Sequence, residues 1–138
     1  MSLASEKQGP RALIVPEATE FLEGARAGEL RVPSCKACNL TFFPPRPFCP
    51  ACGSRDVEHI RASGRGTLYS YIISHMPSPG FEPPFTIAVV ELEEGPRLMA
   101  NIVECEPAPE ALTLDMALEV VFEERGGVTL PCFRPATP

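Results

Sequence analysis

Basic side chains are scarce in this sequence, and lysine is nearly absent. Among 138 residues only Lys7 and Lys36 are lysines, and 18 acidic residues outnumber 12 basic ones, which gives a formal net charge of -6 at pH 7. Proteins that bind a nucleic-acid backbone need clustered lysine and arginine side chains. Because no such cluster is visible, the composition argues against a nucleic-acid partner.

Long apolar segments are missing as well. No run approaches the ~20 apolar residues that a membrane-spanning helix needs, and no signal-peptide pattern precedes the first cysteine pair. Stable disulfides belong to oxidising compartments. We therefore expect a cytoplasmic, reducing location and no membrane contact.

Groups for independent catalysis are also few. The sequence has two histidines, His59 and His75, and it contains no P-loop, no GxGxxG fingerprint and no GxSxG elbow. Cys105 and Cys132 lie in strand-like runs without a neighbouring histidine, so we expect them to pack as small apolar side chains. We expect no enzyme activity of the chain alone, and a catalyst that uses His75 or Cys132 is the least favoured hypothesis.

What the sequence does contain is four cysteines in two CxxC pairs. Cys35 and Cys38 form the first pair, and Cys49 and Cys52 form the second, ten residues further on. Two such pairs can supply four thiolates to one tetrahedral zinc ion, with disulfides or iron as the alternatives. Because four thiolates leave no open position for water, the pattern predicts a structural zinc rather than a catalytic one.

The cysteine pairs also divide the chain. We predict a flexible leader over residues 1–16, a short helix over 17–30, a zinc ribbon over 31–58 and a barrel domain over 59–138. Phe21, Leu22 and Ala25 form an apolar edge on the predicted helix. A helix this short is not stable alone in water, so this edge must dock either on the ribbon of the same chain or on a partner protein.

The remainder has a β pattern. Five strand-like runs cover residues 67–74, 85–92, 97–104, 117–124 and 128–133, and several are apolar on both faces. Five short strands of this kind predict a mainly β fold with a closed five-stranded OB-type barrel. Residues 107–115 connect the third and fourth runs and leave room for little more than one helical turn.

A proline-rich loop interrupts the barrel between its first two strands. Residues 75–84 contain four prolines and one glycine, and prolines restrict a loop to one shape that can bind a ligand or partner. We therefore select His75, Met76, Phe81 and Phe85 as candidate contact residues, while Phe81 folded back on the barrel is the alternative. Arg46 is a further candidate for an acidic or phosphate group, against a solvated arginine.

Several motifs together resemble a known family. They are Phe21–Leu30, Cys35-x-x-Cys38, Phe43-Pro-Pro-Arg46, Cys49-Pro-x-Cys-Gly53, Ser63-Gly-Arg-Gly-Thr67, Val90-Glu-Leu92, Val121-Phe-Glu-Glu124, Thr129-Leu-Pro131 and Phe133-Arg-Pro135. In this order they resemble the acyl-CoA-associated OB-fold proteins that carry a rubredoxin-like zinc ribbon. One departure is Asn39, where glycine is usual, and asparagine tolerates the same left-handed backbone.

The resemblance implies a role beyond what the residues alone indicate. Such proteins are accessory subunits in hetero-oligomers with thiolase-fold or other CoA-processing enzymes, and they assist assembly and the channelling of the acyl or pantetheine arm. The partner then supplies the nucleophilic cysteine. The predicted helix and ribbon would dock on it, and the barrel face with the proline-rich loop would approach acyl-CoA.

The alternative function is a nucleic-acid-binding module, because zinc ribbons and OB barrels both serve in that role. Tyr69, Tyr71 and Phe85 are the aromatic residues available to stack on bases. The acidic charge counts against this reading.

Overall fold

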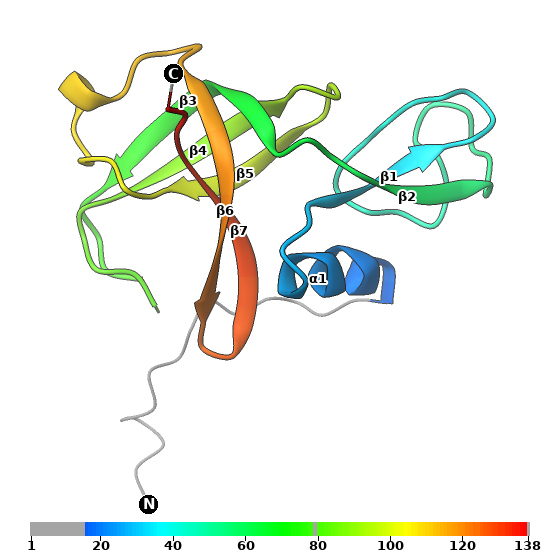
Figure 1. Ribbon diagram of the computed structural model, residues 1–138, viewed down its shortest axis with the longest axis horizontal. Helices are drawn as coiled ribbons and strands as arrows, with labels where there is room; N and C mark the ends of the chain where they lie inside the picture. Colours follow the sequence, from blue (N-terminus) through cyan, green and yellow to red (C-terminus); the bar gives the residue numbers. More distant parts are fainter. Residues whose placement is uncertain (1–15, 79, 138) are drawn as a thin grey trace, which may run out of the picture.

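The computed structural model describes residues 16–78 and 80–137, so the predicted leader lies outside the described residues except for Pro16. A short helix is followed by a two-stranded ribbon and then by a barrel (Figure 1). The elements are η2 (Pro16–Ala18), α1 (Thr19–Arg26), β1 (Arg31–Cys35), β2 (Val57–Arg61), β3 (Arg65–Ser74), β4 (Phe85–Leu92), β5 (Arg97–Ile102), η3 (Pro109–Ala111), β6 (Ala117–Arg125) and β7 (Val128–Pro135). In these ranges no helix has the length and apolar character to cross a membrane.

The helix is shorter than the predicted range 17–30. It ends at Arg26 because Gly28 adopts a left-handed backbone with φ of 80°, a conformation in which glycine commonly terminates helices. The chain then turns directly into β1. Arg31 fastens this turn, since its guanidinium binds Glu20 on the helix at 2.8 Å and Glu29 at 3.0 Å.

The apolar edge of α1 packs on the chain itself, with Ala25 buried and Phe21 and Leu22 half-buried. The ring of Phe21 packs on that of Phe43, with centroids 5.1 Å apart, and both rings contact the hydrophobic core. Ala25 is 2% exposed, and α1 contacts both β1 and β7. Of the two predicted docking sites for the helix, the structure supports the one on the same chain. The helix contacts the barrel as well as the ribbon.

The predicted OB-type barrel is confirmed. Its five strands close in the order β3-β4-β5-β7-β6, and all neighbours are antiparallel except β5 and β7, which meet in parallel at Ile102 and Phe133. Gly66 permits the close approach of β4 to β3, because a Cβ there would lie 2.6 Å from the carbonyl oxygen of Glu91. The third strand ends at Ile102 rather than at the predicted residue 104, where Glu104 has a φ of 54°.

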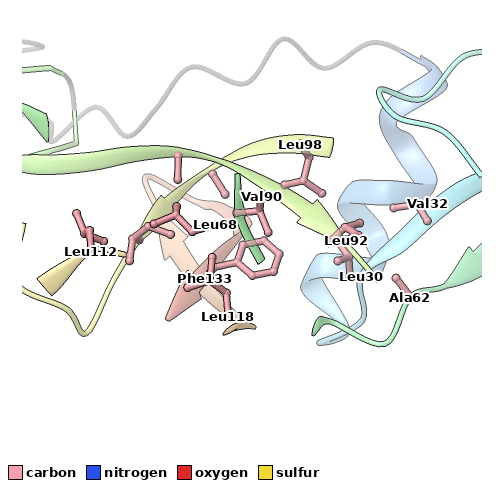
Figure 2. Close-up of a cluster of buried hydrophobic side chains, with 13 residues drawn as sticks. Leu30, Val32, Ala62, Leu68, Val90, Leu92, Leu98, Leu112, Leu118 and Phe133 are labelled. Carbon is pink, nitrogen blue, oxygen red and sulfur yellow. The ribbon is translucent and has the colours of Figure 1, made fainter. Parts of the chain in front are cut away.

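The ribbon and the barrel share one hydrophobic core. Figure 2 shows Leu68, Val90, Leu118 and Phe133 inside the barrel, with Leu92 extending the cluster toward the ribbon. The members on the ribbon side are Leu30, Val32 and Ala62. Because the cluster is continuous, the ribbon packs directly on the barrel through shared apolar side chains. A smaller cluster combines Phe42 with the first cysteine of each pair, Cys35 and Cys49.

Candidate functional site

Two similar turns position the four cysteines. In the first turn Asn39 has a φ of 64° and its N–H donates to the carbonyl oxygen of Cys35 at 2.8 Å. In the second turn Gly53 has a φ of 77° and its N–H donates to the carbonyl oxygen of Cys49 at 2.9 Å. Asparagine and glycine are the residues that tolerate this left-handed backbone best, which explains their places after the second cysteine of each pair.

The four sulfur atoms fit one tetrahedral ion. Cys35 Sγ and Cys52 Sγ lie 3.6 Å apart, as do Cys38 Sγ and Cys49 Sγ, and all four sulfurs lie within 4.8 Å of one another. Zinc–sulfur bonds of about 2.3 Å place tetrahedral thiolates about 3.8 Å apart. All four cysteines are free of disulfides. The sulfur set therefore matches a closed structural zinc site.

The backbone around the second pair favours the thiolate form that zinc requires. Burial acts to raise the pKa of the Cys49 thiol, but hydrogen bonds from the N–H groups of Cys52 and Ala51, together with those of the Cys38 and Cys52 thiols, bring this pKa down to about 7. The Ala51 N–H lies 3.4 Å from Cys49 Sγ. These N–H groups would also orient the sulfur toward a bound ion.

The proline-rich loop between β3 and β4 contacts the end of β6 through Arg125. The Phe81 ring stacks on Phe85, with centroids 5.1 Å apart, and the guanidinium of Arg125 lies 4.5 Å from the centroid of the Phe81 ring. Arg125 Nη1 donates to the carbonyl oxygen of Gly80 at 3.0 Å, while Glu123 binds Nη2 at 2.8 Å. Phe81 thus folds back on the barrel, as the alternative prediction stated.

Beneath this loop lies a mainly apolar cavity of about 370 Å³. It brings together three of the predicted contact residues, Met76, Phe81 and Phe85, with Met99 of β5. His75 is exposed and is not among its lining residues. Arg46 lies elsewhere and lines a second cavity, of about 440 Å³, between α1 and the ribbon.

Next to the first cavity, apolar side chains are exposed on the outer face of β3, β4 and β5. Ile72 pairs with Ile87 and Val89 pairs with Met99 across these strands, while Ile72 is 61% exposed, Met99 72% and the adjacent Met76 75%. We call Ile72, Met76 and Met99 the outer apolar face. Contiguous exposed apolar groups of this kind mark interaction surfaces.

Arg125 and Met99 were not among the residues predicted from the sequence. Arg125 directly precedes the Gly126-Gly127 turn and looks like an ordinary charged strand end, yet its hydrogen bond to Gly80 spans 45 residues. Met99 follows the strand alternation that separates outer from inner positions. That alternation was the one available signal that its side chain points outward.

The aromatic residues proposed for nucleic-acid stacking are already engaged. Arg97 covers the Tyr69 ring at 3.8 Å, Tyr71 packs against the core, and Phe85 stacks on Phe81. Base stacking needs free ring faces beside positive charge. The site geometry therefore gives no support to the nucleic-acid alternative.

Of the two candidate groups for independent catalysis, the Cys132 thiol is shifted away from its reactive form. Burial raises the pKa of the Cys132 thiol to about 11, and the charge of Glu123 adds to this, so Cys132 is protonated near neutral pH. Nucleophilic cysteines need the opposite shift. His75 lies exposed in the loop.

Comparison with known proteins agrees with this layout. Residues 22–58 match the family described as "ChsH2, rubredoxin-like zinc ribbon domain", and residues 59–123 match "ChsH2, C-terminal OB-fold domain". Among solved structures, the "Ltp2-ChsH2(DUF35) aldolase" contains a chain with a TM-score of 0.84 and 40% identity, which covers 92% of this chain and 100% of that one.

Three curated relatives extend the comparison. A "DUF35 domain-containing scaffold protein" of Pyrococcus furiosus is 42% identical over 62% of this chain and 67% of its own length. The "Benzoylsuccinyl-CoA thiolase subunit BbsA" of Thauera aromatica is 29% identical over 94% of this chain and 90% of its own. A "Probable enoyl-CoA hydratase alpha subunit" of Thermomonospora curvata is 40% identical over 94% of this chain, which spans only 40% of that relative.

Proposed function

The chain belongs to the DUF35 family of zinc-ribbon and OB-fold proteins, and we propose that it is a non-catalytic scaffold subunit of an acyl-CoA-processing complex with a thiolase-fold partner. The observation that carries this proposal is the match at 40% identity over the whole length of the chain in the Ltp2-ChsH2(DUF35) aldolase. The relative named as a thiolase subunit supports the same class of partner.

The chemistry of the chain supports a non-catalytic role. Its four cysteine sulfurs form a closed set, and catalytic zinc keeps an open position for water or substrate. The partner would then supply the nucleophile, while this chain positions the acyl-CoA. The zinc ribbon acts as a structural arm on the barrel because the two parts share one core.

The surfaces available for assembly differ from those expected from the sequence. Since Ala25 of α1 is buried and Phe21 packs on Phe43, the helix retains only the half-buried Phe21 and Leu22 as apolar surface for a partner. The ribbon still exposes Leu40 and Phe48, at 37% and 43%. We assign partner docking to these two residues together with the outer apolar face. Met76 and Met99 of that face also border the cavity beneath the proline-rich loop, so acyl-CoA would approach this cavity at the edge of the interface.

Co-expression tests the proposal. The chain is expressed with the thiolase-fold protein encoded beside its gene, and the two are separated by size-exclusion chromatography. We expect co-elution and a partner that loses solubility or thioester turnover when this chain is left out. The control is the chain alone, which should turn over no acyl-CoA. A monomeric chain beside a partner that is fully active without it contradicts the proposal.

A further inference from the structure

Within the described ranges, β5 and β7 pair at a single position of the barrel. Ile102 pairs with Phe133, and the N–H of Val103 donates to the carbonyl oxygen of Phe133 at 2.8 Å. By contrast, β7 pairs with β6 along its whole length, from Val128 to Pro135. The edges of β5 and β7 that precede the Ile102–Phe133 pair therefore face each other without pairing.

The open edge of β5 presents backbone groups to this gap. At the start of the β4–β5 pair the N–H of Leu92 donates to the carbonyl oxygen of Pro96 at 2.9 Å. Hydrogen-bonded and non-hydrogen-bonded pairs alternate along antiparallel strands, so Leu98 and Ala100 take the hydrogen-bonded positions opposite β4. Met99 lies between them and directs its N–H and C=O away from β4, toward β7. An added strand can bond to such an edge.

An apolar cavity of about 180 Å³ lies beside this edge. It is lined by residues 98–101 of β5 and residues 130–132 of β7, with Phe21 of α1 and Phe43 contributing aromatic surface. A cavity of about 150 Å³ admits a group the size of benzene, so this one can accept an aliphatic side chain. The gap thus offers an added strand both backbone partners and an apolar cavity.

The chain just before the described residues has the composition of a strand. Residues 11–15 read Arg-Ala-Leu-Ile-Val, and five residues is a common strand length. Ile14 and Val15 are β-branched, which favours strands, and a residue that precedes a proline, as Val15 precedes Pro16, favours extended backbone. Pro10 limits the run at its other end, because proline has no N–H to donate.

This segment is long enough to reach the cavity. Pro16 and Phe21, which lines the cavity, lie about 8 Å apart along a helix axis, whereas five extended residues span about 16 Å. Charge favours the same contact. Residues 62–137 contain 11 acidic and four basic side chains, while residues 1–15 contain Lys7 and Arg11 against the single acidic residue Glu6.

We propose that residues 11–15 bind in the gap between β5 and β7 as an added strand. Their backbone bonds to the edge of β5 at Met99, and an aliphatic side chain of the segment fills the apolar cavity. The flexible leader predicted from the sequence is then limited to residues 1–10. The Met99 side chain stays on the outer apolar face, because side chains stand perpendicular to a sheet. The added strand therefore lies beside the proposed partner surface, and this inference does not depend on the proposed function.

Hydrogen exchange measured by NMR on the zinc-loaded full chain tests the proposal. We expect slow exchange of the Met99 N–H in the parent, and a nuclear Overhauser effect between the methyl groups of Ile14 and Leu130. In the double variant Leu13→Ser/Ile14→Ser the Met99 N–H should exchange about tenfold faster or more. The Val103 N–H, which bonds to β7 directly, should stay protected and serves as the internal reference.

The matched control is Leu3→Ser/Ala4→Ser, which replaces two apolar residues of the leader outside the segment and should leave the Met99 N–H unchanged. Three results overturn the proposal. The first is an unprotected Met99 N–H in the parent, and the second is equal acceleration in the control. The third is protection that rises with protein concentration or requires an added thiolase-fold partner, since a second copy or the partner would then occupy the edge.

Discussion

Arg125, at the end of β6, lies with its guanidinium carbon 4.5 Å from the centre of the Phe81 ring in the loop between β3 and β4. This contact joins the loop between the first two barrel strands to the end of the fourth strand, and OB-fold proteins bind oligonucleotides through loops at these two positions. With the loop fixed there, the barrel presents a cavity lined by Met76, Phe81 and Phe85. The barrel face is therefore shaped for an apolar group rather than for stacked bases.

Replacing Arg125 should release the loop. Arg125→Met removes the cation–π contact and the hydrogen bond to Gly80, with an expected loss of about 1–2 kcal/mol in the free energy of unfolding. The Phe81 N–H, which donates to Ser78 at 2.9 Å, should exchange faster with deuterium in NMR experiments. Arg65→Met, which breaks an exposed ion pair with Glu93, should leave that amide unchanged. Unaltered protection of Phe81 in Arg125→Met would show that the clamp does not hold the loop.

Zinc removal should unfold the ribbon. The metal supplies most of the folding free energy of such a small unit, on the order of 10 kcal/mol for structural zinc. We expect one zinc per chain by elemental analysis, and loss of it in Cys49→Ser with a lower melting temperature. Cys105→Ser should keep the metal, because Cys105 lies outside the sulfur cluster. A melting curve that chelation does not change would contradict the prediction.

The outer apolar face should be needed for assembly and not for folding. Met99→Lys places a charge on a side chain that is 72% exposed, so the melting temperature should change little, while the affinity for the thiolase-fold partner should fall tenfold or more. Glu110→Lys introduces a lysine at an exposed site in η3 and is the control. Equal partner affinity in both variants, measured by surface plasmon resonance, would exclude this face from the interface.

The helix should contribute to stability through Phe21. Phe21→Ala removes the ring that packs on Phe43 and the core, and the expected loss is about 2 kcal/mol or more in urea unfolding, below the value for a fully buried ring. Glu23→Ala on the exposed side of the same helix should cost less than about 0.5 kcal/mol. If both variants unfold at the same urea concentration, α1 does not stabilise the barrel.

The metal site and the barrel could be predicted because their signals are local. The spacing of Cys35, Cys38, Cys49 and Cys52 specifies two sulfur pairs, and the adjoining Asn39 and Gly53 supply the left-handed backbone that the turns require. Period-two alternation located the strands in 67–74, 97–104 and 117–124, a near-continuous apolar run located 85–92, and the Gly126-Gly127 turn marked the start of 128–133; each of these signals is local in the sequence. Only the ends of the strands differ from the predicted ones, as at Glu104, which adopts a left-handed backbone conformation.

The amino-acid sequence by itself therefore determined the zinc ligands, the strands and the class of fold. Only the tertiary structure decided that Phe21 meets Phe43, that Arg125 clamps Phe81, and that Arg46 shares a cavity with Arg55 and His59. These contacts join segments far apart in the chain. These contacts depend on the strand register and on the coiling of the closed barrel. The spacing of side chains along the sequence does not encode the register or the coiling locally.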